Sequence, residues 1–184
     1  MIAQTAVINQ WTQGRLLRQG VVIVMGTLLL ALSARVEIPF WPVPFTMQTF
    51  VVLALGLIYG PVLGVATMLA YLGQGLMGLP VFAAGGGPGY LAGPTGGYLL
   101  GMVAAMGIAG ALGVRWWLAN PVFAIAAAGL ANLAVYALGV TWLGVYLGSI
   151  EQAVTAGLLP FLPGAVLKIG AAGLIAWGVA RMTR

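Results

Sequence analysis

The 184-residue sequence contains no cysteine and no histidine. A chain without them forms no disulfide, no thiolate nucleophile and no zinc, iron–sulfur or haem site built on those residues. Acidic residues are nearly absent too, because Glu37 and Glu151 are the only two, and serine occurs only at Ser33 and Ser149. Paired carboxylates and an activated nucleophile are therefore missing. These absences argue against an enzyme and predict neither a metal nor a cofactor.

Charge of either sign is scarce. Charged residues make up 5% of the chain and hydrophobic residues 62%, whereas soluble domains carry about 25% charged residues. Long apolar runs interrupted by glycine and proline are typical of transmembrane helices. The net charge of +5 comes from dispersed residues, with no basic patch for nucleic acid. The composition predicts an all-α integral membrane protein.

Glycine and proline divide the apolar sequence into segments. Since a span needs about 20 residues, the chain has room for six or seven helices. Gly60-Pro61 and the proline-rich run 39–44 end two of the segments. We predict a short N-terminal segment over 1–19 and a single six-helix transmembrane domain over 20–184. The six spans are expected at about 20–34, 45–59, 61–77, 97–114, 121–143 and 160–180.

The arginines orient these spans. With the N-terminus inside, five basic residues face the cytoplasm, and Arg35 alone faces outward; the five are Arg15, Arg18, Arg115, Arg181 and Arg184. An excess of positive charge on the cytoplasmic side is the usual pattern in membrane proteins. Merging the second and third spans would place Arg115 outside. The charges thus predict six spans with both termini cytoplasmic.

The segment from 78 to 98 is rich in glycine and proline and carries no charge. An exposed turn is one interpretation. A long uncharged loop between two spans is better explained as a capping or binding loop, because irregular backbone at membrane depth must be buried or line a cavity. Glycine lets backbone N–H groups approach a ligand, and Tyr90 and Tyr98 offer amphipathic rings. No strand precedes the glycines, so they do not form a nucleotide-binding fingerprint.

Lys168 is the only lysine. It lies thirteen residues before Arg181, about 20 Å from the cytoplasmic end of a helix. We expect Pro163-Gly164 to break the chain and to leave Lys168 near the first turn of the helix proper. It could snorkel to the outer surface, but an ammonium without a nearby acid favours a ligand carboxylate. It lacks the glycine pattern of a P-loop, so no ATP hydrolysis by that route is expected.

A few polar residues interrupt the apolar spans, among them Gln48, Gln74 and Asn132. An amide on its own is more typical of contacts between helices than of a ligand site, although for Asn132, near mid-membrane, the sequence favours neither role over the other. Gln48 is the exception, since it opens the second span on the outer side, where Lys168 and the glycine-rich segment also lie. Thr27 and Ala31 have the spacing of a small-residue face. That face packs inside the chain or docks a partner subunit, and the sequence leaves both possibilities open.

Three stretches together resemble a known family. They are Ile-Pro-Phe-Trp-Pro-Val-Pro-Phe-Thr-Met-Gln-Thr at 38–49, Tyr-Leu-Gly-Gln-Gly-Leu-Met-Gly-Leu-Pro-Val-Phe-Ala-Ala-Gly-Gly-Gly at 71–87 and Gly-Pro-Thr-Gly-Gly-Tyr-Leu-Leu-Gly at 93–101. They resemble the BioY family, the biotin-specific substrate-binding subunits of energy-coupling-factor (ECF) vitamin transporters. The resemblance extends from about Leu28 to Trp177.

This resemblance implies a six-helix subunit that holds biotin in an outward-facing cavity capped by loops. It also implies a membrane-embedded coupling subunit and ABC-type ATPases as partners, in the plasma membrane of a bacterium or archaeon. The family's Pro-Gly-Asp-x-x-Lys pattern becomes Pro163, Gly164, Ala165 and Lys168 here, so the role of the acid does not carry over. The expected biotin site comprises Gln48, Gly86, Gly87, Gly89, Tyr90, Gly96, Gly97, Tyr98 and Lys168.

Four functions remain in competition on the sequence alone. The leading one is a biotin-binding transport subunit whose partners supply the energy. A self-sufficient biotin facilitator would share the same site, and only reconstitution separates the two. A binding subunit for another vitamin is disfavoured by the motifs Val-Pro-x-Thr-x-Gln and Gly-Pro-Thr-Gly-Gly-Tyr. An intramembrane enzyme is disfavoured by the missing catalytic groups.

Overall fold

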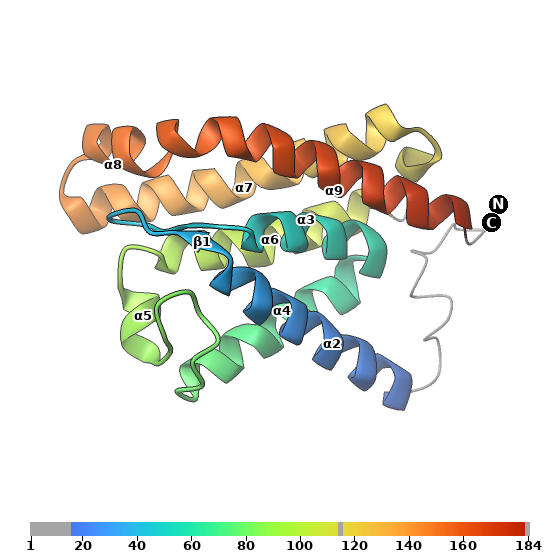
Figure 1. The fold of residues 1–184 in the computed structure, drawn as a ribbon, viewed down its shortest axis with the longest axis horizontal. Helices are drawn as coiled ribbons and strands as arrows, with labels where there is room; N and C mark the ends of the chain where they lie inside the picture. Colours follow the sequence, from blue (N-terminus) through green and yellow to red (C-terminus); the bar gives the residue numbers. More distant parts are fainter. Residues whose placement is uncertain (1–15, 114–115, 183–184) are drawn as a thin grey trace.

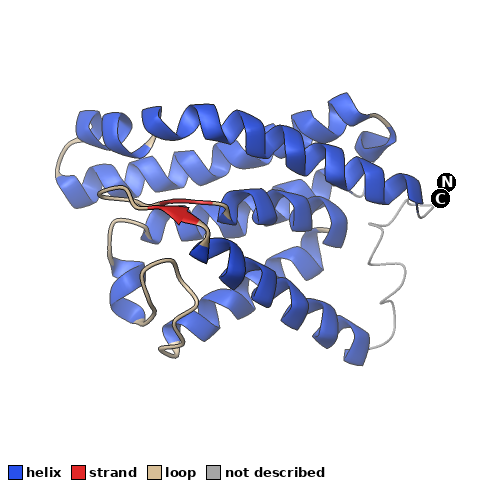
Figure 2. Ribbon diagram, viewed as in Figure 1, coloured by secondary structure: helices blue, strands red, loops and turns tan. Residues whose placement is uncertain are grey.

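The computed structural model describes residues 16–113 and 116–182. The described part of the chain is mostly helical, and its strands form a small two-stranded hairpin (Figure 2). Its six longest helices are α2 (Leu16–Arg35), α3 (Gln48–Tyr59), α4 (Pro61–Leu76), α6 (Gly96–Gly113), α7 (Pro121–Leu147) and α9 (Leu162–Met182). The shorter elements are β1 (Glu37–Ile38), β2 (Phe45–Thr46), α5 (Pro88–Ala92), η1 (Trp116–Ala119), α8 (Ile150–Gly157) and η2 (Leu159–Phe161).

The six longest helices lie where the sequence predicts spans. Four apolar helical runs in the described residues are long enough to cross a membrane, and they are Leu16–Arg35, Gly96–Gly113, Pro121–Leu147 and Ile150–Met182. The helices α3 and α4 have only 12 and 16 residues, about 18 and 24 Å in length. Each helix is shorter than the hydrocarbon core of about 30 Å, so a crossing at either position also needs the residues that adjoin the helix. The structure therefore supports a multi-pass membrane protein.

Local sequence explains the helix ends. Gly60 has a φ of 81° and ends α3, and Pro61 begins α4, so these two helices are separate as predicted. The side chain of Asn120 accepts a hydrogen bond from the Val122 N–H at the start of α7. Gly148 ends α7 in the left-handed conformation, and Ser149 caps α8 through the Gln152 N–H.

Several short elements were not predicted, and two of them lie at the loop-rich side of the molecule. Residues 37–46 form the antiparallel hairpin β1–β2, in which Glu37 pairs with Thr46 and Ile38 with Phe45, where the prolines predicted only an irregular turn. The second is α8, an eight-residue helix inside a segment that the sequence analysis treats as a loop. Both elements are too short for a periodic pattern to reveal.

The core is centred on α6, which packs against α7, α3 and α4. Gly97, Gly101, Ala105, Ala109 and Gly113 recur every fourth residue along α6, and all five are buried. A Cβ atom at Gly101 would lie 2.7 Å from the Val135 Cα, so the backbones of α6 and α7 approach closely there. Small residues at this spacing thus form the face through which α6 packs inside the molecule.

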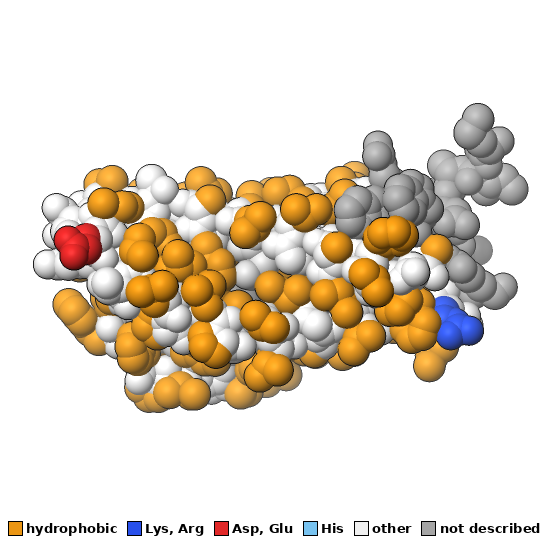
Figure 3. Space-filling view, turned by 90° about the horizontal axis from the view of Figure 1, so that it is seen from above, with side chains coloured by type: hydrophobic (Ala, Val, Ile, Leu, Met, Phe, Trp, Pro, Cys, Tyr) orange, Lys and Arg blue, Asp and Glu red, His pale blue; other side chains and the backbone are white. Residues whose placement is uncertain are grey.

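The molecule has two distinct ends (Figure 1). The first residues of α2 and the last residues of α9 lie at one end, and the hairpin, α5 and α8 lie at the other. We call the latter the loop end. Seen from above, most of the surface is hydrophobic, with an acidic group at one extremity and a basic group at the opposite one (Figure 3). Such a distribution suits a molecule whose middle lies in lipid.

Candidate functional site

A cavity with two adjoining lobes lies near the loop end. Five residues line both lobes, and they are Val43, Pro44, Thr46, Tyr98 and Met102. The first, which we call the Gln48 lobe, has a volume of about 30 Å³ and is completed by Gln48, Phe82, Ala83, Tyr90, Thr95 and Leu99. The second, the Lys168 lobe, has a volume of about 40 Å³ and is completed by Thr49, Val135, Tyr136, Phe161 and Lys168.

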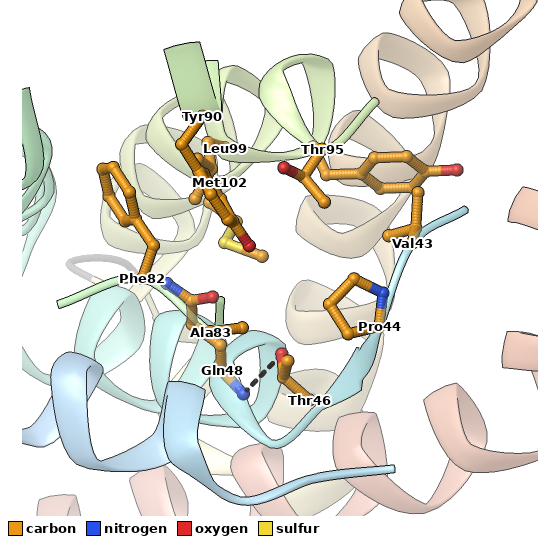
Figure 4. Close-up of a pocket in the computed structure, with 11 residues that line it drawn as sticks. Val43, Pro44, Thr46, Gln48, Phe82, Ala83, Tyr90, Thr95, Leu99 and Met102 are labelled. Atoms are coloured by element: carbon orange, nitrogen blue, oxygen red, sulfur yellow. Dashed lines mark hydrogen bonds between the residues drawn. The ribbon is translucent and has the colours of Figure 1, made fainter. Parts of the chain in front are cut away.

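Gln48 lies at the first position of α3, and 4% of it is exposed. Its Nε2 donates to the Tyr71 hydroxyl at 2.9 Å, and that hydroxyl donates to the Val81 carbonyl at 2.9 Å. The amide end of Gln48 points toward Phe82 and Tyr90 (Figure 4). A chain of hydrogen bonds thus joins the wall of the Gln48 lobe to the glycine-rich segment and fixes a polar amide in a mostly apolar wall.

The glycine-rich segment 78–95, which we call the cap segment, is packed rather than loose. Phe82 is 1% exposed, and its ring lies 5.4 Å from that of Tyr71 and 4.9 Å from that of Tyr90. Gly75 makes this packing possible, because a Cβ there would overlap the Phe82 ring. Burial raises the pKa of Tyr90 above its usual value, so its hydroxyl remains a donor at neutral pH.

Arg35 ties the cap segment to α2. It is the last residue of that helix, and its guanidinium donates to the carbonyls of Pro80 and Ala83. Ala83 in turn lines the Gln48 lobe. The sequence predicts Arg35 on the outer side and predicts no contact for it. Only the folded structure reveals this contact, because arginine and carbonyls are 45 or more residues apart.

Lys168 is 8% exposed and lies in the second turn of α9, because the helix begins at Leu162 rather than after Pro163-Gly164. Its Nζ donates to the Thr46 carbonyl at 2.5 Å and lies 3.7 Å from the centroid of the Phe45 ring. Neither Glu37 nor Glu151, both in the described ranges, forms an ion pair with it. The ammonium is therefore buried against the cavity, which disfavours snorkelling to the surface.

Tyr98 lies where the two lobes meet. Its hydroxyl donates to the Gly157 carbonyl at 2.7 Å. Glycine at 139 and 157 leaves room for this side chain, because a Cβ at Gly139 would overlap its ring and a Cβ at Gly157 its hydroxyl. Residues of α7 and α8 therefore fix the Tyr98 ring in the wall of the cavity.

The structure brings four of the nine predicted site residues to the cavity wall: Gln48, Tyr90, Tyr98 and Lys168. The five predicted glycines do not line either lobe. Gly86 and Gly89 are exposed, and a Cβ at Gly86 would overlap the Leu79 carbonyl. Gly87 has a φ of 98° and donates its N–H to the Gly75 carbonyl at 2.7 Å. These three glycines shape the cap segment instead of touching the cavity.

Gly96 and Gly97 serve helix packing. A Cβ at Gly96 would overlap the Leu91 carbonyl, and one at Gly97 would overlap Trp142 of α7. The wall residues that sequence analysis missed are mainly apolar, such as Val43, Phe82 and Met102. Their residue types occur throughout this chain, so no sequence signal separates them from the general core. Val43, Thr46 and Thr95 are exceptions, since they belong to the motifs Val-Pro-x-Thr-x-Gln and Gly-Pro-Thr-Gly-Gly-Tyr.

The face predicted from Thr27 and Ala31 is turned into the chain. Thr27 is 2% exposed, and its hydroxyl accepts a hydrogen bond from Gln74 Nε2 of α4 at 3.2 Å. Ala31 is half-buried. Thr27 is therefore not available to a partner subunit in this conformation, and Gln74 joins two helices as its residue type suggested. Val21, Met25, Leu28 and Leu32 form part of the exposed surface of α2.

The sequence is similar to that of known transport proteins. The sequence model of the BioY family matches residues 4–184. The "Biotin transporter BioY" of Thermotoga maritima is 38% identical over 157 residues, which cover 82% of this chain and 88% of that protein. The "Probable biotin transporter BioY" of Pyrococcus horikoshii is 36% identical over 152 residues, covering 80% and 87%.

The fold has a counterpart among solved structures. The crystal structure of the S-component for biotin from an ECF-type ABC transporter superposes with a TM-score of 0.79 at 21% sequence identity. The match covers 92% of this chain and 94% of that one. At this identity the likeness shows that the two chains share a fold.

Proposed function

The chain belongs to the BioY family, and on that premise we propose that it binds biotin in the two-lobed cavity and acts as the substrate-binding subunit of a biotin uptake system. The observation that carries the proposal is the polarity of the cavity. It has an amide at one extremity, an ammonium at the other and mostly apolar side chains between them.

Biotin matches this distribution of groups. Its carboxylate would accept a charge-assisted hydrogen bond from Lys168, and its ureido group would bond the amide of Gln48 and the hydroxyl of Tyr90. The apolar ring and valeryl chain would contact Met102, Tyr98 and other apolar side chains of the wall. An apolar pocket with few directed polar groups is the usual design of a small-molecule site.

The cavity is nearly closed in this conformation. Volumes of about 30 and 40 Å³ hold about two or three waters each, so the walls must separate before a vitamin enters. The cap segment and the β1–β2 hairpin form the wall nearest the loop end. We place this end on the outside of the plasma membrane, where biotin would arrive.

Six membrane crossings with both termini cytoplasmic complete the proposal. The start of α2 and the end of α9 share one end of the molecule (Figure 1), as an even number of crossings requires. Of the predicted N-terminal segment 1–19, residues 1–15 lie outside the described residues, as do Arg115 and Arg184, whereas residues 16–19 belong to α2. Arg181 is described and lies in the last turn of α9, at the end of the molecule that the positive-inside rule assigns to the cytoplasm.

The topology has a direct test, because the natural chain has no cysteine. Ala119 and Gln152 are exposed, one beside Arg115 and the other in α8. In intact cells an impermeant maleimide should label Gln152→Cys and should label Ala119→Cys only after the membrane is opened. Labelling of Ala119→Cys from outside intact cells would refute the orientation.

The sequence has no P-loop, so ATP hydrolysis that drives transport would take place in other subunits. We therefore propose a membrane-embedded coupling subunit and ABC-type ATPases as partners. Reconstitution into liposomes tests this: accumulation of labelled biotin against a gradient should require the partners and ATP. Equal uptake by the chain alone would instead identify a facilitator.

Biotin binding is the first experiment. The purified chain, stripped of bound ligand, is titrated with biotin by calorimetry in detergent, with riboflavin and thiamine as control vitamins. We expect saturable one-to-one binding of biotin only. Absence of binding by protein that is monodisperse and unfolds cooperatively would contradict the proposal.

A further inference from the structure

Phe45 lies directly against the Lys168 ammonium. It is the first residue of β2, and its ring centroid is 3.7 Å from Nζ. The same ring packs on Phe161 of η2 with a centroid separation of 5.5 Å. Gly164 of α9 admits the ring, because a Cβ there would overlap the tip of Phe45. Residues of β2, η2 and α9 thus hold the face of the Phe45 ring over the Lys168 ammonium.

Phe45 also lines a space outside the two lobes. On the outer side is an apolar pocket of about 190 Å³, lined by Ile38, Phe40, Phe45, Pro160 and Phe161. Phe161 lines both this pocket and the Lys168 lobe. The pair Phe45–Phe161 therefore stands between the ammonium and the outer pocket, and it leaves the Lys168 lobe as the space that the ammonium faces.

The contacts of Lys168 can be counted. An ammonium has three N–H donors, and one of them bonds the Thr46 carbonyl. A buried ammonium needs further partners, and neither acidic residue of the chain is within ion-pair distance. The negative face of an aromatic ring attracts a cation without neutralising it. One side of the ammonium is thus left to face the Lys168 lobe.

We propose that Phe45 is a positioning residue of the ligand site, whose ring holds the Lys168 ammonium in place of a carboxylate and turns its remaining N–H toward the ligand. The inference rests on the proposed function in that it takes the ligand to be biotin. Within the motif Val-Pro-x-Thr-x-Gln, Phe45 occupies a position that the motif leaves open. A carboxylate in its place would compete with the ligand for the ammonium, whereas a ring does not.

Removing the ring tests this role. Phe45→Leu keeps an apolar side chain but loses the aromatic face. Because a cation–π contact in a desolvated site contributes up to about 2 kcal/mol, we expect the dissociation constant for biotin to rise about five- to thirty-fold. The matched control is Phe40→Leu, which removes a neighbouring ring that contacts Phe161 at 6.1 Å but not Lys168. It should change the constant less than about twofold.

A double-mutant cycle separates positioning from packing. In a Lys168→Met background, Phe45→Leu should have less than about a twofold effect, since the ammonium that the ring holds is gone. An equal loss in both backgrounds would show that the ring acts through packing alone and would overturn the inference. Gel filtration and thermal unfolding of each variant in detergent establish that it is folded before titration.

Graded fluorination provides a second test that does not depend on truncation. Phenylalanine, 3,5-difluorophenylalanine and pentafluorophenylalanine at position 45 have similar shapes and progressively weaker ring faces. The dissociation constant should rise in that order, and no trend would overturn the inference. If the unmodified chain itself fails to bind biotin, the proposed function fails, and that outcome is distinct from binding that is insensitive to position 45.

Discussion

The two lobes of the cavity hold their polar groups in different ways. In the Gln48 lobe, the amide is one member of a chain of hydrogen bonds that passes through Tyr71 to Val81. Arg35 then fastens the same cap segment to α2. In the Lys168 lobe, the ammonium of Lys168 contacts only the Thr46 carbonyl and the face of the Phe45 ring among the interactions described above.

The difference shows what each lobe contributes to binding. A chain of paired hydrogen bonds fixes geometry and stabilises the folded cap segment. A buried ammonium with an incomplete set of partners costs stability but interacts strongly with an incoming anion. We therefore expect changes on the Lys168 side to alter affinity more than stability, and changes on the Gln48 side to alter both.

Replacing the ammonium should have the largest effect on binding. Lys168→Met keeps the length of the side chain and removes its charge. Loss of a hydrogen bond to a charged group costs about 1.5–3 kcal/mol, which is about 10- to 150-fold in the dissociation constant for biotin. The melting temperature should not fall, because a buried charge is removed. Calorimetry and thermal unfolding check the two expectations, and unchanged affinity would remove Lys168 from the site.

Breaking the hydrogen-bond chain on the other side should have a smaller effect on binding. Tyr71→Phe removes the hydroxyl that accepts from Gln48 and donates to Val81. The unpaired groups should lower the free energy of unfolding by about 1–3 kcal/mol and weaken biotin binding about fivefold. Tyr59→Phe is the matched control, because its hydroxyl donates to Val22 at 3.3 Å away from the cavity. Tyr59→Phe should lower the stability of the protein without weakening biotin binding. Equal weakening of biotin binding by Tyr71→Phe and Tyr59→Phe would contradict the difference between the two lobes.

Releasing the cap segment from α2 should have the smallest effect. Arg35→Gln removes the guanidinium that bonds Pro80 and Ala83. Because these contacts are partly exposed, we expect about a twofold change in affinity. Amide hydrogen exchange in residues 78–87 should accelerate, as expected for a segment with fewer restraints. Arg181→Gln, which loses a ring contact with Trp177 at the end of α9, should leave exchange in that segment unchanged.

Much of this arrangement could be predicted from the sequence. Apolar runs and the Gly60-Pro61 turn gave the helix boundaries, because their signals are local. Gln48 and Lys168 were found because polar side chains are conspicuous in apolar helices. The role of the glycines could not be predicted, since a glycine that admits a ligand and one that admits another part of the chain look alike. Phe45 was missed for a related reason: an aromatic side chain gives no sign in the sequence that it faces a charge.

The small-residue face of α6 limits how the sequence can change. At Gly97, Gly101 and Gly113, a Cβ would overlap atoms of neighbouring helices, whereas Leu100 and Ile108 on the other side of the helix are exposed. In a complete substitution library of α6, positions that do not tolerate larger side chains should recur about every fourth residue. Permissive positions would accept almost any apolar side chain, and intolerant ones would accept nothing larger than the native residue. Random mutagenesis would therefore reveal the buried face of α6 before any ligand was known.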